Sequence, residues 1–251
     1  MSEQPALSIR DLNKSFGALI VAQSIDVDLM KGARVGLIGP NGAGKTTFVN
    51  LLTGFVKADS GTIHLEGMPI EKMAPETRVK HGLARTHQIN ALLRENTMRD
   101  NVAIAIAERE GYAWRMMRFG RQWRYCCNEA QALLEEMGIG DSGARIVREL
   151  SYGQQRLLEI AIALALKPSV LLLDEPAAGV PSHEAHRIHD ALEQLPAEMA
   201  ILIIEHDMEV IFRFAREIIV LLQGRVLTRG EPAKIAADPE VRAVYLGRTM
   251  V

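Results

Sequence analysis

Alternating apolar and polar residues near the N-terminus predict strands that are buried on one face only. Apolar side chains stand at every second position in residues 7–9 and 25–29, and residues 61–66 repeat the alternation before Gly67. Such a strand turns one face to a core and the other to solvent. We therefore expect half-buried strands at these three places in the chain.

Short apolar runs predict a second kind of strand. Residues 35–38 form such a run. Residues 170–173 form another, as expected of a central parallel strand covered on both faces, and residues 201–204 predict a further buried strand. Residues 218–222, followed by Gly224 and Val226, indicate a closing hairpin. These short apolar runs, with the polar residues that follow them, indicate an α/β sheet.

Apolar residues at helical spacing predict helices at residues 46–52, 99–110, 126–137 and 157–166. Gly54 suits the C-terminal end of the first helix, and Pro168 ends the last. With 251 residues, 48% of them hydrophobic, the chain is long enough for one large α/β domain or a core with a lobe.

Charge and cysteine content bear on partners and compartment. The formal net charge of −2 gives no general attraction to nucleic acid or to an anionic membrane. Cys126 and Cys127 are adjacent and cannot join separated segments, so we expect a reducing compartment. Residues 1–7 lack a signal-peptide pattern, and no apolar run approaches the ~20 residues that span a bilayer. Any membrane role is therefore expected to be exercised through another chain.

A glycine-rich loop joins the apolar run 35–38 to the helix at 46–52. It has the phosphate-loop pattern and reads Gly39, Pro40, Asn41, Gly42, Ala43, Gly44, Lys45, Thr46 and Thr47. The glycines let backbone N–H groups converge on one point, and the helix adds the positive end of its dipole there. Lys45 can reach the β- and γ-phosphates, and the Thr46 hydroxyl suits the octahedral shell of Mg²⁺. The loop predicts a nucleoside triphosphate site.

Two adjacent carboxylates follow the apolar run 170–173. The carboxyl ends of strands in an α/β sheet form the edge at which ligands bind. Asp174 is therefore expected to join the Mg²⁺ shell, and Glu175 to face a water molecule. His206 follows the run 201–204 and would lie on the same edge as Asp174.

Three further features each allow two interpretations. Phe16, at an expected turn, can stack on a base or plug the core, and spacing alone favours the plug. The polar turn in residues 150–156 can bind a second phosphate, or Ser151 can simply cap the following helix. Residues 112–125 hold both tryptophans and four arginines at steps of three, which fits a solvated basic face or a surface for anionic headgroups.

In this order, the motifs resemble the nucleotide-binding subunit of ABC transporters over essentially the whole chain. The resemblance is carried by the loop 39–47, Gln88, the signature segment 150–156, Asp174-Glu175 and His206. It implies one ABC ATPase domain over residues 1–251, an α/β fold with a RecA-like P-loop core and an N-terminal antiparallel β-subdomain. The expected parts are the core at about 1–87 and 161–225, a helical signature lobe at about 88–160 and a C-terminal extension at about 226–251.

The resemblance also implies roles for individual residues. ATP would lie between two copies, with the signature segment of one facing the phosphate loop of the other. Ser151 and Gly153 would then contact the γ-phosphate across the dimer, with Gln154 beside them, and Phe16 would stack on adenine, which reverses the preference from spacing. Glu175 would polarise the attacking water, while Lys45, Mg²⁺ and His206 neutralise the developing charge. Gln88 would touch Mg²⁺ and water and face the membrane partner.

A narrower resemblance is to the ATPases of the branched-chain amino acid importers. It is carried by residues 84–88, 152–156, 174–179, 204–208 and 245–247. Two positions depart from that pattern. His87 stands where an aromatic residue is usual, and Pro181 stands where a polar residue lies in the loop that crosses the dimer seam.

The resemblance implies a set of partners and a location. The partners are a second ATP-binding subunit placed head to tail, transmembrane permease subunits and a periplasmic or extracellular solute-binding protein. This chain would lie at the cytoplasmic face of the inner (plasma) membrane. No nucleic acid is expected among its partners. A lipid or lipopolysaccharide export ATPase and a soluble ABC ATPase acting on nucleic acid or ribosomes stay open as alternatives. The soluble class usually carries two cassettes or a coiled-coil insertion, and neither is seen in this sequence.

Overall fold

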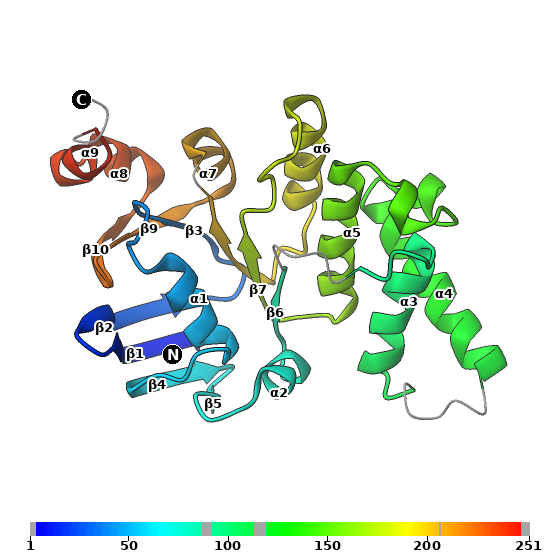
Figure 1. The fold of residues 1–251 in the computed structure, drawn as a ribbon, viewed down its shortest axis with the longest axis horizontal. Helices are drawn as coiled ribbons and strands as arrows, with labels where there is room; N and C mark the ends of the chain where they lie inside the picture. Colours follow the sequence, from blue (N-terminus) through cyan, green and yellow to red (C-terminus); the bar gives the residue numbers. More distant parts are fainter. Residues whose placement is uncertain (1–3, 87–91, 113–118, 206, 247–251) are drawn as a thin grey trace. The chain divides into compact units, whose positions relative to one another are not determined.

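A computed structural model describes residues 4–86, 92–112, 119–205 and 207–246 (Figure 1). These residues fall into two units. The first unit consists of the described residues within 1–83, 169–175 and 196–251. The second consists of the described residues within 84–168 and 176–195. Within the described residues, no helix combines the length and apolarity needed to cross a membrane.

An antiparallel sheet forms the N-terminal part of the first unit. β1 (Leu7–Phe16) and β2 (Leu19–Leu29) make a hairpin, β4 (Ser60–Leu65) pairs with β1, and the short β5 (Met68–Pro69) pairs with β4. Buried and exposed residues alternate along much of these strands, as the sequence predicted. The expected N-terminal antiparallel β-subdomain is confirmed.

A second sheet carries the strands that lead to the predicted site. Its order is β10-β9-β3-β8-β7-β6, with β3 (Arg34–Ile38), β6 (Leu83–Arg85), β7 (Val170–Asp174), β8 (Ala200–Ile204), β9 (Glu217–Leu222) and β10 (Arg225–Gly230). β9, β3, β8 and β7 run parallel, and β10 closes the sheet as an antiparallel hairpin with β9. Every residue of β7 and β8 is buried, which confirms the prediction of strands covered on both faces.

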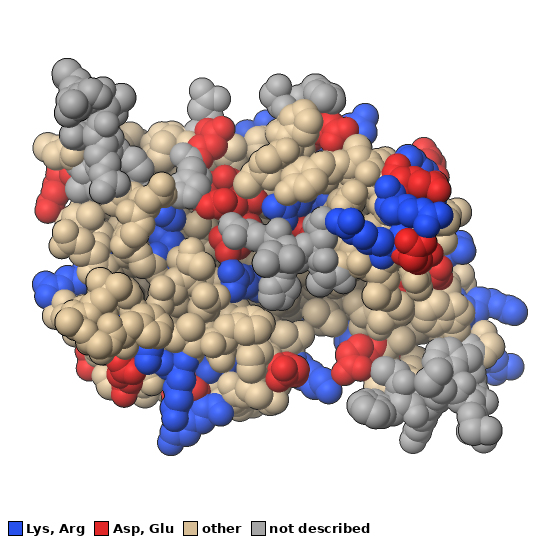
Figure 2. Space-filling model, viewed as in Figure 1, with Lys and Arg blue, Asp and Glu red and all other residues tan. Residues whose placement is uncertain are grey.

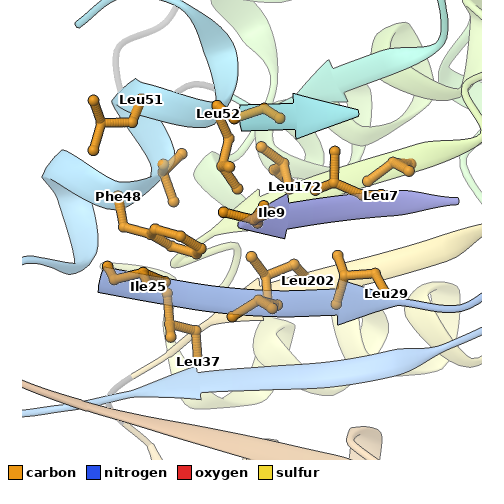
Figure 3. Packing of buried hydrophobic residues seen from close by; sticks show 14 of the residues in the cluster. Leu7, Ile9, Ile25, Leu29, Leu37, Phe48, Leu51, Leu52, Leu172 and Leu202 are labelled. Atoms are coloured by element: carbon orange, nitrogen blue, oxygen red, sulfur yellow. The ribbon is translucent and has the colours of Figure 1, made fainter. Parts of the chain in front are cut away.

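Both sheets share one core with α1 (Lys45–Thr53). Figure 3 shows apolar side chains from β1, β2, β3, β7, β8 and α1 pointing toward one another, and the labelled ones are Leu7, Ile9, Ile25, Leu29, Leu37, Phe48, Leu51, Leu52, Leu172 and Leu202. Because Phe48 and Leu52 are buried there, the core fixes the position of α1 and of the loop before it.

A buried guanidinium holds the C-terminal end of α1. Arg78, on α2 (Pro75–Lys80), donates to the carbonyls of Leu51 at 2.7 Å and Leu52 at 2.6 Å. It also donates to the carbonyls of Met73 and Glu71. The last carbonyls of a helix have no partner inside the helix and carry the negative end of its dipole. Arg78 therefore satisfies and neutralises this end of α1, although burial lowers its pKa.

Helices make up most of the second unit, namely α3 (Met98–Arg109), α4 (Phe119–Glu136), α5 (Tyr152–Ala165) and α6 (Ser182–Glu193), with 3-10 turns at Gly140–Ser142 and Val147–Glu149. The sequence predicted that α4 begins at 126, and this is wrong: the exposed Arg121 and Arg124 are good helix formers and extend it toward the N-terminus. Trp114, Arg115 and Arg118 lie outside the described residues.

Helices of the first unit beyond β8 are α7 (Met208–Phe214), α8 (Pro232–Ala237) and α9 (Pro239–Leu246). On the face seen in Figure 2, lysine and arginine side chains are interspersed with aspartate and glutamate. This mixing agrees with the formal net charge of −2.

An ionic cluster joins three segments of the second unit. Glu129 on α4 accepts from Arg109 at the end of α3 at 2.8 Å, and pairs with Lys167 after α5 at 2.9 Å. Arg109 also donates to the carbonyl of Ala165 at 2.6 Å. The hydrogen bond from Arg109 is the main cause that lowers the pKa of Glu129 from its ordinary value of 4.5 to about 2.

Replacing Arg78 with Met should destabilise the first unit. The change removes a charged donor from the buried end of α1, so we expect a loss of about 2–4 kcal/mol in the free energy of unfolding. Urea denaturation followed by circular dichroism measures it. Lys80→Met, at the exposed end of the same helix, is the control, and an equal effect of both variants would contradict the role of Arg78.

Replacing Glu129 with Gln should remove a pH-dependent part of the stability. Because folding lowers the pKa of Glu129, its contribution is complete above pH ~4.5 and is lost as the pH falls toward 2. After screening by solvent we expect the variant to lose about 1–2 kcal/mol at pH 7 and little at pH 2.5. Urea titrations at both pH values test this, with Glu136→Gln on the same helix as the control for charge. A difference as large at pH 2.5 as at pH 7 would count against the ion pairs as its source.

Candidate functional site

The phosphate loop lies between the end of β3 and the start of α1. Lys45 is 7% exposed, and its ammonium donates to the carbonyls of Gly39 at 2.6 Å and Pro40 at 3.2 Å. Gly44 has a φ of 103°, and a Cβ there would lie 2.6 Å from the carbonyl oxygen of Val21. Glycine is thus required at this position for the loop to pass close to β2.

The first turn of α1 presents backbone donors that no side chain caps. Gly44 stands at the N-cap and has no side chain to accept from the N–H groups of the first turn. The N–H of Phe48 donates to the carbonyl of Gly44 at 2.8 Å. The N–H groups without a capping side chain, the positive end of the helix dipole and Lys45 all belong to the start of α1, which is the chemistry of a phosphate site.

Two carboxylates stand near the lysine in the same unit. Asp174 ends β7 and is 4% exposed, and Glu175 follows it. Burial lowers the pKa of Lys45, while the charges of Glu175 and Asp174 act to raise it. Both acids, which follow β7, are therefore close enough to the phosphate loop for their charges to act on Lys45.

Glu175 has an unusual backbone conformation. Its φ of 48° lies in the left-handed region, which is unfavourable for a residue with a side chain. Its N–H donates to the carbonyl of Ile204 at the end of β8, at 2.8 Å, which helps to hold it there. Strain of this kind is common where a side chain must be aimed at a reacting group.

The residues expected to hold Mg²⁺ are only partly described. In the described part of the chain, no cluster of three or more His, Cys, Asp or Glu side chains could hold a metal ion. Mg²⁺ usually needs fewer protein ligands than three, because substrate phosphates and water fill most of its coordination shell beside one or two carboxylates. The buried Asp174 and the exposed Thr46 hydroxyl fit that arrangement. Gln88, the third expected ligand, lies outside the described residues.

Phe16 ends β1 at the tip of the hairpin with β2. Its side chain is 52% exposed, so the interpretation as a core plug is wrong. The ammonium of Lys14 stands 5.1 Å from the centre of its ring and pairs with Asp59 at 2.6 Å. The neighbouring Leu19 and Ile20 are exposed as well. The ring is therefore accessible for stacking on a flat ligand.

The signature segment begins α5 with a capping box. The Ser151 hydroxyl accepts from the N–H of Gln154 at 3.3 Å, and the Gln154 side chain accepts from the N–H of Ser151 at 3.2 Å. This confirms that Ser151 caps the helix, as one of the two interpretations held. It leaves open the other, because a capped start can still donate to an anion.

Glu184 is a residue of this segment that the sequence did not reveal. From the first turn of α6 its Oε2 accepts from the Ser151 hydroxyl at 3.1 Å and from the N–H of Gly153 at 3.0 Å. Glu184 lies 31 positions from Gly153. No local pattern links positions so far apart, so the sequence carried no signal for this contact.

The predicted site residues thus divide between the two units. The phosphate loop, Asp174 and Glu175 come together in the first unit, and Ser151, Gly153 and Gln154 in the second. His206 lies outside the described residues, as does His87. Pro181 stands at the N-cap of α6, and its carbonyl accepts from Glu184 and Ala185.

Comparison with known proteins gives consistent matches over most of the chain. Residues 22–178 match the family model of the ABC transporter. The high-affinity branched-chain amino acid transport ATP-binding protein LivG of Escherichia coli (strain K12) is 37% identical over 97% of this chain and 98% of its own length. The high-affinity branched-chain amino acid transport ATP-binding protein BraF of Pseudomonas aeruginosa is 34% identical over 97% of this chain and 98% of its own length.

Solved structures agree with these matches. A nucleotide-free ATP-binding cassette from an ABC transporter has a TM-score of 0.83 at 29% identity and covers 96% of this chain and 99% of its own. A cassette of an ABC transporter in its ADP conformation also has a TM-score of 0.83 at 29% identity, with 98% and 100% covered. The fold predicted from the sequence motifs is therefore confirmed.

Replacing Phe16 with Ala should weaken ATP binding with little effect on the apo protein. The loss of one base-stacking contact is worth ~1–3 kcal/mol, whereas a half-exposed ring contributes little to folding. Equilibrium titration with ATP and thermal unfolding without nucleotide give the two quantities. Met68→Ala, an exposed apolar residue on the edge strand β5, is the control. Unchanged ATP affinity together with a large loss of apo stability would reject stacking.

Proposed function

The chain belongs to the ABC transporter family, and we propose that it is the ATP-hydrolysing subunit of an importer for branched-chain amino acids or related small carboxylates and amides. The observation that carries the hydrolytic function is the buried Lys45 in the phosphate loop beside Asp174 and Glu175. The solute class is supported by LivG and BraF, which are branched-chain amino acid transport ATP-binding proteins and match this chain over 97% of its length.

Binding of the nucleotide uses the first unit. The N–H groups at the start of α1 and the Lys45 ammonium hold the phosphates, and Phe16 stacks on adenine. Lys45 would exchange its bonds to the Gly39 and Pro40 carbonyls for bonds to phosphate oxygens. Because burial already disfavours the charged ammonium, a phosphate anion is a strongly favoured partner.

Hydrolysis transfers the γ-phosphoryl group to water. The bond between the γ-phosphorus and the bridging oxygen breaks as the water oxygen bonds to phosphorus, and charge spreads over the γ-oxygens. Glu175 accepts a hydrogen bond from the attacking water and orients it, while Lys45 neutralises charge. Mg²⁺, held by Thr46 and Asp174, supplies further neutralisation when bound. We assign Gln88 to the metal and water, and His206 to the γ-phosphate.

A second copy completes the site. Ser151, Gly153 and Gln154 at the start of α5 would face the γ-phosphate bound by the other subunit, in a head-to-tail homodimer or heterodimer. The contact of Ser151 and Gly153 with a carboxylate oxygen supports this role, because the same donors suit a phosphate oxygen. Closure on ATP and reopening after hydrolysis would then drive transport.

Transport requires further chains. We propose that the subunit docks from the cytoplasmic side on transmembrane permease subunits through the region of Gln88, and that a periplasmic or extracellular solute-binding protein delivers the solute. The named relatives, all transport ATP-binding proteins, support an assembly of this kind. The subunit would be peripheral to the inner (plasma) membrane.

Replacing Glu175 with Gln should abolish most ATP turnover and leave nucleotide binding intact. The amide keeps the size of the side chain but is a weaker acceptor for the attacking water, and we expect a fall of roughly 10²–10⁴ in kcat, the usual contribution of such a group. The variant should accumulate as a closed dimer with ATP, which size-exclusion chromatography with light scattering detects.

The control is Glu66→Gln, because Glu66 has the same φ of 48° and lies in the same unit. It should keep its turnover, which separates the loss of the carboxylate at the site from the effect of changing a strained glutamate. Normal ATP hydrolysis by the Glu175→Gln variant would contradict the assignment of Glu175 as the residue that orients the attacking water.

A further inference from the structure

We propose that Glu184 is a positioning residue of the ATP site, whose carboxylate occupies the place of the γ-phosphate at the start of α5 in the free subunit. ATP bound by the second copy would displace it. The inference rests on the proposed function, in which Ser151 and Gly153 meet the γ-phosphate across the dimer.

The contact uses the donors that the phosphate would need. One oxygen, Oε2 of Glu184, accepts from the Ser151 hydroxyl at 3.1 Å and from the Gly153 N–H at 3.0 Å. Each of these donors has a single proton. Neither can serve Glu184 and a phosphate oxygen fully at the same time, so the carboxylate and the γ-phosphate compete for them.

Gly153 makes room for this competition. A Cβ at Gly153 would lie 2.4 Å from Oε2 of Glu184 and 3.1 Å from its Cβ. Only a residue without a side chain lets an oxyanion come this close to the first turn of α5. The carboxylate is therefore seated at the helix start as a bound anion would be.

The capping box remains when the carboxylate leaves. The Ser151 hydroxyl accepts from Gln154 through its oxygen, whereas it donates to Glu184 through its proton. Exchange of Glu184 for phosphate redirects that proton and leaves the cap unchanged. Glu184 itself is anchored on α6 by its N–H, which donates to the carbonyl of Pro181 at 2.8 Å, so a rotation of the side chain is sufficient.

This exchange distinguishes ATP from ADP. Only ATP carries a γ-phosphate that can take both donors from Glu184, and a carboxylate left in place would repel it. Glu184 thus keeps the signature segment preformed in the free subunit and raises the ATP concentration needed for closure. When the γ-phosphate leaves after hydrolysis, the carboxylate can return and favour reopening.

The test measures dimer formation against ATP concentration in the presence of Mg²⁺. Glu175→Gln serves as the parent, so that hydrolysis does not deplete the dimer, and analytical ultracentrifugation gives the midpoint. Adding Glu184→Gln should lower the midpoint about three- to tenfold, the range expected for an anion at a helix start. Binding of ADP to the monomer should not change.

Two further variants isolate the contact. Glu184→Asp keeps the charge but is one methylene shorter, so it should lower the midpoint as Gln does. Glu193→Gln makes the same change of charge near the other end of α6 and should leave the midpoint at the parent value.

The outcomes separate the inference from the proposed function. If the parent forms no dimer with ATP, the sandwich and the inference both fail. If the parent forms the dimer but Glu184→Gln and Glu184→Asp leave its midpoint unchanged or raise it, the inference alone is overturned. A rise is what a purely structural cap predicts, because its loss would weaken the start of α5.

Discussion

Packing of α1 into the core shared by both sheets is the constraint on which the nucleotide site depends. Phe48 and Leu52 fix the helix from the side, and Arg78 neutralises its C-terminal carbonyls. The negative end of the helix is thus compensated inside the protein, while the positive end, at Gly44, is left for a ligand. A loop of nine residues can hold phosphate because the helix behind it cannot shift.

Charge compensation explains how the Lys45 ammonium can be buried. The loop carbonyls of Gly39 and Pro40 accept from its ammonium, and Asp174 and Glu175 stabilise its charge. Mg²⁺ at Asp174 would bring the positive charge that balances the phosphates of ATP. The same few groups therefore serve the free and the bound state with different partners.

Sequence reasoning succeeded where the signal was local. The ends of the buried strands β7 and β8 lie within one residue of the ends of the predicted runs. Four successive apolar residues indicate a strand that is covered on both faces. The roles of Arg78 and Glu184 were not predicted, because the α1 carbonyls that Arg78 reaches and the donors to Glu184 lie 26 to 33 positions away in the chain. The exposure of Phe16 likewise depends on how the hairpin tip is placed, which periodicity alone leaves undecided.

The starts of α1 and α5 differ in how they are capped. In the proposed function both helices offer N–H groups to a phosphate, and α1 would hold one with either ATP or ADP bound, which suits a start that Gly44 leaves without a side-chain cap. The start of α5 is expected to meet phosphate only in the closed dimer. A helix end that binds an anion for part of the cycle is more stable with a substitute for the rest, and the Glu184 carboxylate is such a substitute.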